Sequence, residues 1–91
     1  MCKKDTLPKE IENVVCNNTY GVTPIYCDYI RDNVVALNVK AQDVNVLCLL
    51  PLIKDTIEEI YDVKVVIRNT DVVICFLVDF EYDDITYEIV K

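Results

Sequence analysis

Apolar residues recur along this chain at two spacings, one typical of helices and one typical of strands. The helical spacing occurs first near the N-terminus, where one face of a short helix would consist of Leu7, Ile11, Val14 and Val15. Thr6 is a suitable cap for this helix, and Pro8 suits its first turn. The pattern therefore predicts a short N-terminal helix.

A longer helical pattern covers residues 43–61, where apolar residues return every three or four positions: Val46, Leu50, Ile53, Ile57 and Ile60. Asp43 is a suitable N-cap for this helix. Pro51 conflicts with an unbroken helix, because proline lacks a donor and clashes with the carbonyl of Leu47. Either the helix kinks at Pro51, or a strand through Leu49 precedes a helix that begins near Pro51. We favour the kinked helix.

Five other stretches are rich in β-branched and aromatic residues and are predicted as strands: 25–30, 34–39, 63–68, 72–78 and 85–90. A turn at 31–33 joins the first two strands, and turns at 69–70 and around 83–84 make the last three an antiparallel meander. The chain is therefore expected to be a single α+β domain over residues 1–91, in the order α-β-β-α-β-β-β. Its small antiparallel sheet has about five strands, with the long helix packed on one face and a short N-terminal helix.

The strand at 72–78 is apolar on both of its faces. Val73, Cys75 and Leu77 point to one side, and the four residues between and around them point to the other. A strand of this kind is expected to be central and covered on both sides. The long helix can cover one side, and the other needs either the N-terminal helix or a second copy of the protein. This need motivates the hypothesis of a homodimer.

The chain is acidic, with sixteen Asp and Glu against nine Lys and Arg and a net charge of −7. Binding to naked nucleic acid or to an anionic membrane requires clustered basic residues, so both are disfavoured. A basic protein surface would instead attract this chain. No export signal and no apolar run long enough to span a membrane is found, so a cytoplasmic location is expected.

Several kinds of catalytic chemistry lack their residues here. The chain has no histidine, no serine and a single glycine, which excludes serine- or histidine-based nucleophilic catalysis and phosphate-binding glycine loops. Its five cysteines have no zinc or redox spacing, and Cys27, Cys48 and Cys75 are expected to be buried as small apolar residues. We therefore expect no enzyme activity, no cofactor and no metal. An enzyme that depends on carboxylates or a thiol is the least favoured alternative.

The segment 79–88 combines five carboxylates with two tyrosines and contains no basic residue. It is open to three interpretations: a solvated hairpin turn, a protein-contact surface, or a calcium or magnesium site, the last without the spacing of a known loop. In an extended strand, alternate carboxylates would be spaced at about 7 Å, similar to phosphates along a nucleic acid. The candidate partner-binding residues are Asp79, Glu81, Tyr82, Asp83, Asp84 and Tyr87.

These observations favour a small acidic intracellular protein-binding module. The partner would be a larger protein with a basic, nucleic-acid-binding surface, which the module would occupy as a nucleic-acid mimic. Richness in Ile, Asn, Asp, Lys and Tyr is typical of AT-rich genomes, and small acidic inhibitors are frequent among phage and viral proteins, so an inhibitor of that kind is one hypothesis. The alternative is a structural homo-oligomer or complex subunit that uses an apolar face of its sheet.

Overall fold

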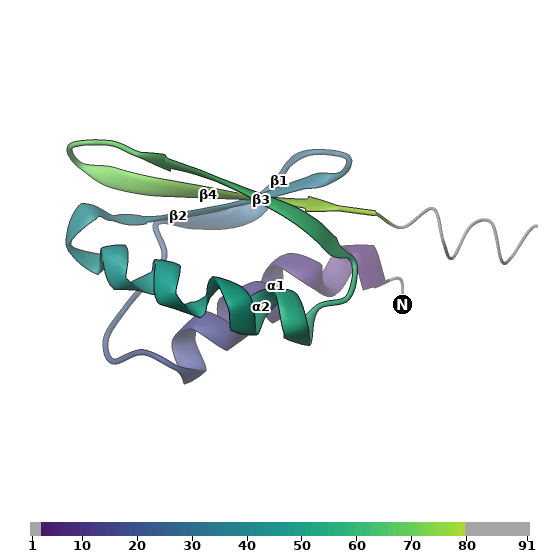
Figure 1. The fold of residues 1–91 in the computed structure, drawn as a ribbon, viewed down its shortest axis with the longest axis horizontal. Coiled ribbons are helices and arrows are strands. Elements are labelled where there is room, and N and C mark those ends of the chain that lie inside the picture. Colours follow the sequence, from purple (N-terminus) through teal and green to yellow (C-terminus); the bar gives the residue numbers. More distant parts are fainter. Residues whose placement is uncertain (1–2, 80–91) are drawn as a thin grey trace, which may run out of the picture.

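A computed structural model describes residues 3–79 as an antiparallel sheet with its helices on one side (Figure 1). The elements are, in order, α1 (Lys3–Asn17), β1 (Tyr26–Arg31), β2 (Val34–Lys40), the 3-10 helix η1 (Ala41–Leu49), α2 (Leu50–Thr56), β3 (Ile60–Ile67) and β4 (Asp71–Val78). The predicted α+β class is confirmed, and the described residues form four strands of the expected five.

The strands lie in the order β1-β2-β4-β3, and every neighbouring pair is antiparallel. Two hairpins, β1–β2 and β3–β4, supply two of these pairings, and the turns between their strands fall where the sequence predicts them. The third pairing joins the hairpins through β2 and β4. Because β2 and β3 both flank β4, the chain between them crosses the sheet, and η1 and α2 form that crossover.

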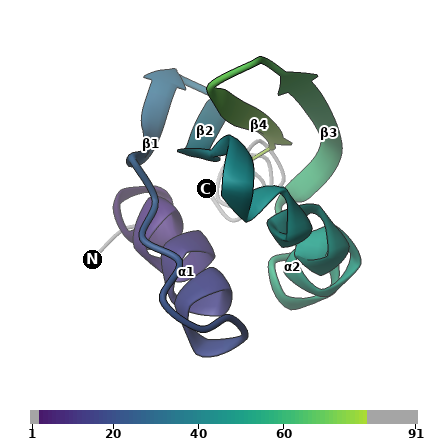
Figure 2. The same cartoon turned by 90° about the vertical axis from the view of Figure 1, so that its left-hand side faces the viewer.

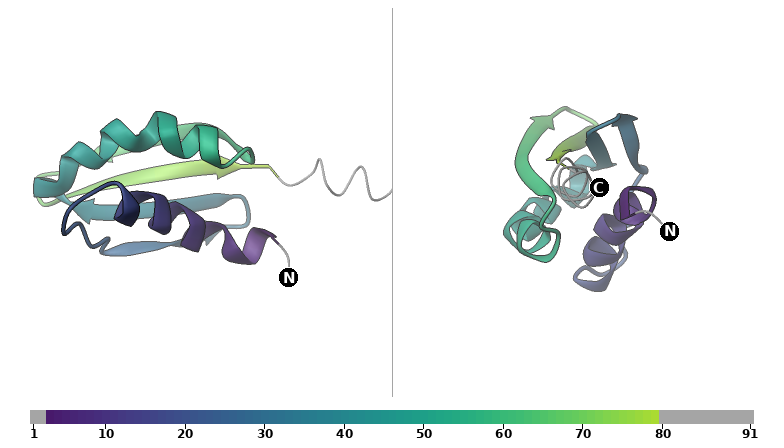
Figure 3. Two further views of the ribbon diagram at one scale, coloured as in Figure 1. Left: turned by 90° about the horizontal axis from the view of Figure 1, so that it is seen from below. Right: turned by 90° about the vertical axis from the view of Figure 1, so that its right-hand side faces the viewer.

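The helix α1 and the η1–α2 segment lie side by side on the same face of the sheet (Figures 2 and 3). The core between these helices and the sheet contains Leu7, Ile11 and Val15 from α1 and Ile53 from α2, packed against the inner side chains of the central strands. These inner side chains are Val35, Leu37, Val39, Val72, Ile74, Phe76 and Val78. Of the two covers proposed for the second face of residues 72–78, the N-terminal helix is therefore wrong, because α1 packs on the first face.

The predicted apolar face of α1 is confirmed, but the helix begins at Lys3, before the predicted cap Thr6. Pro8 consequently lies inside the helix and cannot donate to the carbonyl of Lys4. The hydroxyl of Tyr29 in β1 donates to that carbonyl instead, at 2.5 Å. The helical hydrogen bond that Pro8 cannot form is thus replaced by a bond from Tyr29, which attaches α1 to the sheet.

The helix predicted over residues 43–61 is shorter and differs in kind. Its first part is the 3-10 helix η1, which Lys40 precedes without a side-chain cap, so Asp43 is not the N-cap. Pro51 lies in the first turn of α2, where its missing N–H costs no hydrogen bond. The helix ends at Thr56, Ile57 is extended and β3 begins at Ile60. The predicted helix end near residue 61 is therefore wrong.

The last predicted strand, residues 85–90, lies outside the described residues. For residues 72–78 the expected meander is wrong, because the two strands that pair with β4 are β3 and β2.

Candidate partner-binding surface

Of the six predicted partner-binding residues, the structure describes Asp79 alone. Asp79 directly follows β4, and its backbone N–H donates to the carbonyl of Glu59 at 2.9 Å. It lines a shallow pocket with Asn33, Tyr61 and Val78. The other five residues, Glu81, Tyr82, Asp83, Asp84 and Tyr87, lie outside the described part of the chain, so their role stays a prediction.

The side of the sheet opposite the helices carries an apolar centre. Strand register places three rows of outward side chains next to one another, with β2 and β4 in the middle of each row. We call this surface the open face. Its apolar members are Tyr26, Val34, Ala36, Val66, Val73, Cys75 and Leu77.

Burial differs between the centre and the edges of the open face. Val34, Val73, Cys75 and Leu77 are half-buried by their neighbours in the sheet, and Ala36 is small enough to be shielded by them. Val66 on β3 is 48% exposed and Tyr26 on β1 is 44% exposed. Among residues 3–79 no helix packs on this side. The open face therefore carries a set of apolar side chains that no helix of residues 3–79 covers.

Charged side chains frame this apolar centre. Asp28 on β1 and Lys64 on β3 are exposed at opposite edges of the same row. Asp62 lies one row from Lys64 on β3, and Lys40 ends β2. An apolar centre within a polar rim is the usual composition of a protein–protein interface.

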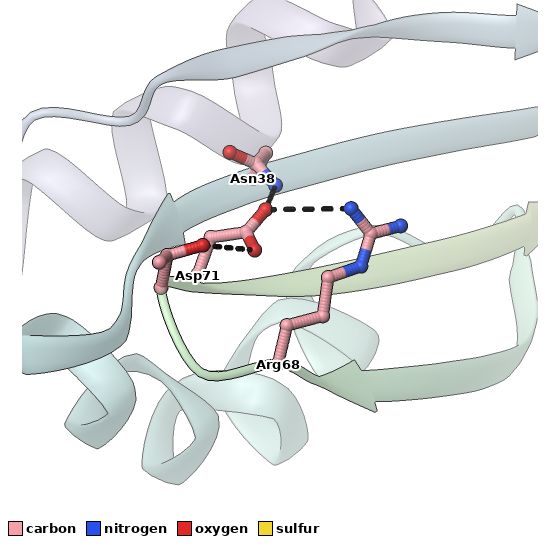
Figure 4. Close-up of polar contacts among 4 residues, drawn as sticks. Asn38, Arg68 and Asp71 are labelled. Atoms are coloured by element: carbon pink, nitrogen blue, oxygen red, sulfur yellow. Dashed lines mark hydrogen bonds and ion pairs between the residues drawn. The ribbon is translucent and has the colours of Figure 1, made fainter.

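A polar cluster closes one end of the open face (Figure 4). The Asn38 amide donates to Asp71 Oδ2 at 2.6 Å, and the Thr70 hydroxyl donates to Asp71 Oδ1 at 3.3 Å. Arg68 reaches the same carboxylate at 3.8 Å. This network holds β2, β4 and the β3–β4 turn together, and it fixes the charges at that end of the face.

The thiols are distributed differently from the prediction. Cys48 is exposed on η1, so its predicted burial is wrong, whereas Cys27 and Cys75 are half-buried on opposite faces of the sheet. Cys27 donates to the carbonyl of Pro8 at 3.2 Å in a shallow pocket between α1 and β1. Burial, followed by the charges of Glu12 and Asp28, raises the pKa of the Cys27 thiol to about 12. Cys27 is thus a protonated thiol near neutral pH, unlike a nucleophilic cysteine.

The acidic segment is visible in the sequence by its composition, whereas the full extent of the open face is not. One part of that face can be read from the chain, because residues 72–78 are apolar on both sides. The participation of Tyr26 and Val66 cannot be read from the chain, because it depends on which strands flank β4 and in what register.

Within residues 3–79, no three acidic or cysteine side chains lie close enough together to hold a metal ion. No helix in that range is both long and apolar enough to cross a membrane. Comparisons of the chain with protein-family models, curated proteins and solved structures found no match.

Proposed function

We propose that this protein is a binding module that acts by associating with another protein chain through the open face of its sheet. The observation that carries the proposal is the apolar centre of that face, over which the described part of the chain places no helix. Each apolar side chain that a partner covers contributes roughly 25 cal/mol per Å² of area removed from water. Covering the open face therefore supplies a driving force that the described fold leaves unused.

The charged rim supports the same function. Exposed Asp28, Asp62, Lys64 and Lys40 surround the apolar residues and leave the centre free of charge. Rim charges contribute little to affinity, but they select partners and fix the orientation of binding. The open face thus has separate elements for affinity and for specificity.

The acidic segment 79–88 is a second candidate contact surface. Five carboxylates and two tyrosines in ten residues favour a basic partner protein, as a nucleic-acid mimic or an inhibitor of the phage type would require. Contacts of this kind are exposed charge pairs, so they weaken strongly as salt is added. Contacts of the open face depend on apolar area and change little with salt.

Two matched substitutions test the open face. Val66 on that face is 48% exposed and Val44 on the helical side is 38% exposed, so Val66→Lys and Val44→Lys introduce the same charge at similar exposure. The immobilised full chain and both variants are incubated with an extract of the native host, and each captured protein is quantified. We expect Val66→Lys to lose at least about tenfold in capture and Val44→Lys to bind normally, since a charge is costly only where it is desolvated.

A second pair of measurements separates the two surfaces. The Asp83→Lys/Asp84→Lys double variant should retain binding if the open face is the contact, and binding should persist as salt is raised to about 1 M. Loss of binding in the double variant, together with normal binding by Val66→Lys, would move the function to the acidic segment.

A further inference from the structure

The charges of the open face are opposite at its two edges. Strand register places Asp28, Ala36, Cys75 and Lys64 in one row across β1, β2, β4 and β3. An acid therefore stands at the β1 edge and a base at the β3 edge, with two small side chains between them. The two charged residues are three strands apart, about 14 Å at the usual strand spacing, so they do not pair within one chain.

This order is complementary to itself under a twofold axis. In a symmetric dimer each surface meets a copy of itself. When the axis runs along the strands, midway between β2 and β4, β1 lies against β3 of the second copy and β2 lies against β4. Asp28 then faces Lys64 of the second copy, and Ala36 faces Cys75. Each of these pairings occurs twice.

The neighbouring rows give the same result. Register places Arg31 beside Val34, so Arg31 faces Asp62 of the second copy, and Lys40 faces Asp71. In the same arrangement Val34 faces Leu77 and Tyr26 faces Val66, whereas Asn38, whose amide is bonded to Asp71, faces Val73. Aligned sheets pack at about 30° to each other, which displaces the edge rows by a few ångströms, within the reach of these long side chains.

Other placements of the axis do not preserve this match. A twofold axis perpendicular to the strands through the Ala36 row sets Asp28 against Asp28 and Lys64 against Lys64. Moved half a row towards Asn38, it sets Asp28 against Tyr26 and Lys64 against Val66. Moved the other way, it sets Asp28 against Arg31 and Lys64 against Asp62, but it leaves the Asn38 row, with Val66 and Val73, without a facing row. The charge pattern and the coverage of all three rows together select the axis along the strands.

The size of the face sets the expected strength. Four strands spaced at about 4.8 Å, each about 24 Å long, present roughly 450 Å² of projected face per copy. This area lies below the roughly 800 Å² per partner of a standard interface, so the association is expected to be weak and reversible.

Resting on the proposed function of the open face, we propose that its partner is a second copy of this chain, packed face to face about a twofold axis parallel to the strands, with Asp28 of each copy against Lys64 of the other.

A charge swap tests this pairing in the full chain. Asp28→Lys sets Lys against Lys, and Lys64→Asp sets Asp against Asp, whereas the double variant restores opposite charges with their signs exchanged. The dimer dissociation constant is measured by sedimentation equilibrium from about 1 μM to 1 mM at physiological salt, a range suited to a weak interface. Each single variant should weaken the dimer about tenfold or more, and the double variant should return to within about threefold of the original.

Matched controls remove the effect of total charge. Asp55→Lys and Lys54→Asp make the same charge changes on α2, on the helical side, and should leave the dimer unchanged. A double variant as weak as the singles overturns the proposed pairing. A chain that stays monomeric at 1 mM overturns the second copy as partner. If Val66→Lys still abolishes capture of a different protein, the proposed function survives without the dimer.

Discussion

The two faces of β4 carry similar side chains in very different surroundings. On the helical side, Val72, Ile74, Phe76 and Val78 are at most 1% exposed. On the other side, Val73, Cys75 and Leu77 have only their neighbours in the sheet and remain half-buried. One strand therefore belongs both to a closed core and to an open surface.

The connection between β2 and β3 accounts for this difference. It crosses over β4 and carries η1 and α2 to one face, where α1 packs beside them. Among residues 3–79 no comparable connection crosses the other face. The apolar surface left in this way is the observation on which the proposed association rests.

The largest expected effect is a loss of unfolding free energy when a buried side chain on the helical side of β4 is truncated. Phe76→Ala should lower the free energy of unfolding by about 3–5 kcal/mol, because it removes a fully buried ring and leaves a cavity. Leu77→Ala, the next residue on the open face, should cost about 1–2 kcal/mol, since less of its surface is buried. Urea denaturation at low micromolar concentration measures both. Equal losses would show that the two faces are packed alike.

Thiol reactivity offers an intermediate contrast. With its pKa near 12, Cys27 holds very little thiolate at pH 8, so it should react with iodoacetamide more than about 30-fold more slowly than exposed Cys48. Peptide mass spectrometry of timed samples measures the alkylation rates of Cys27 and Cys48, and similar rates at pH 8 would contradict the burial of Cys27.

Because its folded pKa is raised, the stabilising contribution of Cys27 is complete below about pH 9 and is lost as the pH rises towards 12.

The smallest contrast concerns two tyrosines on opposite faces of β1. Tyr29→Phe should cost about 1 kcal/mol, because the Lys4 carbonyl that Pro8 leaves without a helical donor loses its partner. Tyr26 donates to the Tyr29 carbonyl at 3.2 Å in an exposed setting, so Tyr26→Phe should cost less than about 0.5 kcal/mol. Thermal and urea unfolding of the two variants compare these costs. A larger loss for Tyr26→Phe would mean that α1 is not held by Tyr29.

Local patterns predicted the hairpins and the buried face of α1 because each depends on neighbours in the chain. The same patterns failed at the end of the long helix. Ile57 and Ile60 keep the helical spacing, yet Ile57 caps α2 in an extended conformation and Ile60 starts β3. Both residues are buried in the structure, and the apolar face of a longer helix would bury them as well. Hydrophobic spacing alone could not decide between the two structures.

The candidate site was less predictable than the fold. The acidic segment stood out by composition, which needs no structure to see. The open face joins Tyr26 on β1 with Val66 on β3, residues forty positions apart that only the register of four strands brings to one surface.

By itself, the sequence determined which side chains share a face of each element, because the periods of strands and helices are properties of the local backbone. It also determined that both faces of β4 are apolar. Only the tertiary structure decided that β2 is the second neighbour of β4 and that both helical layers share one side. Strand order and helix placement depend on contacts between distant segments, and such contacts leave no periodic trace in the chain.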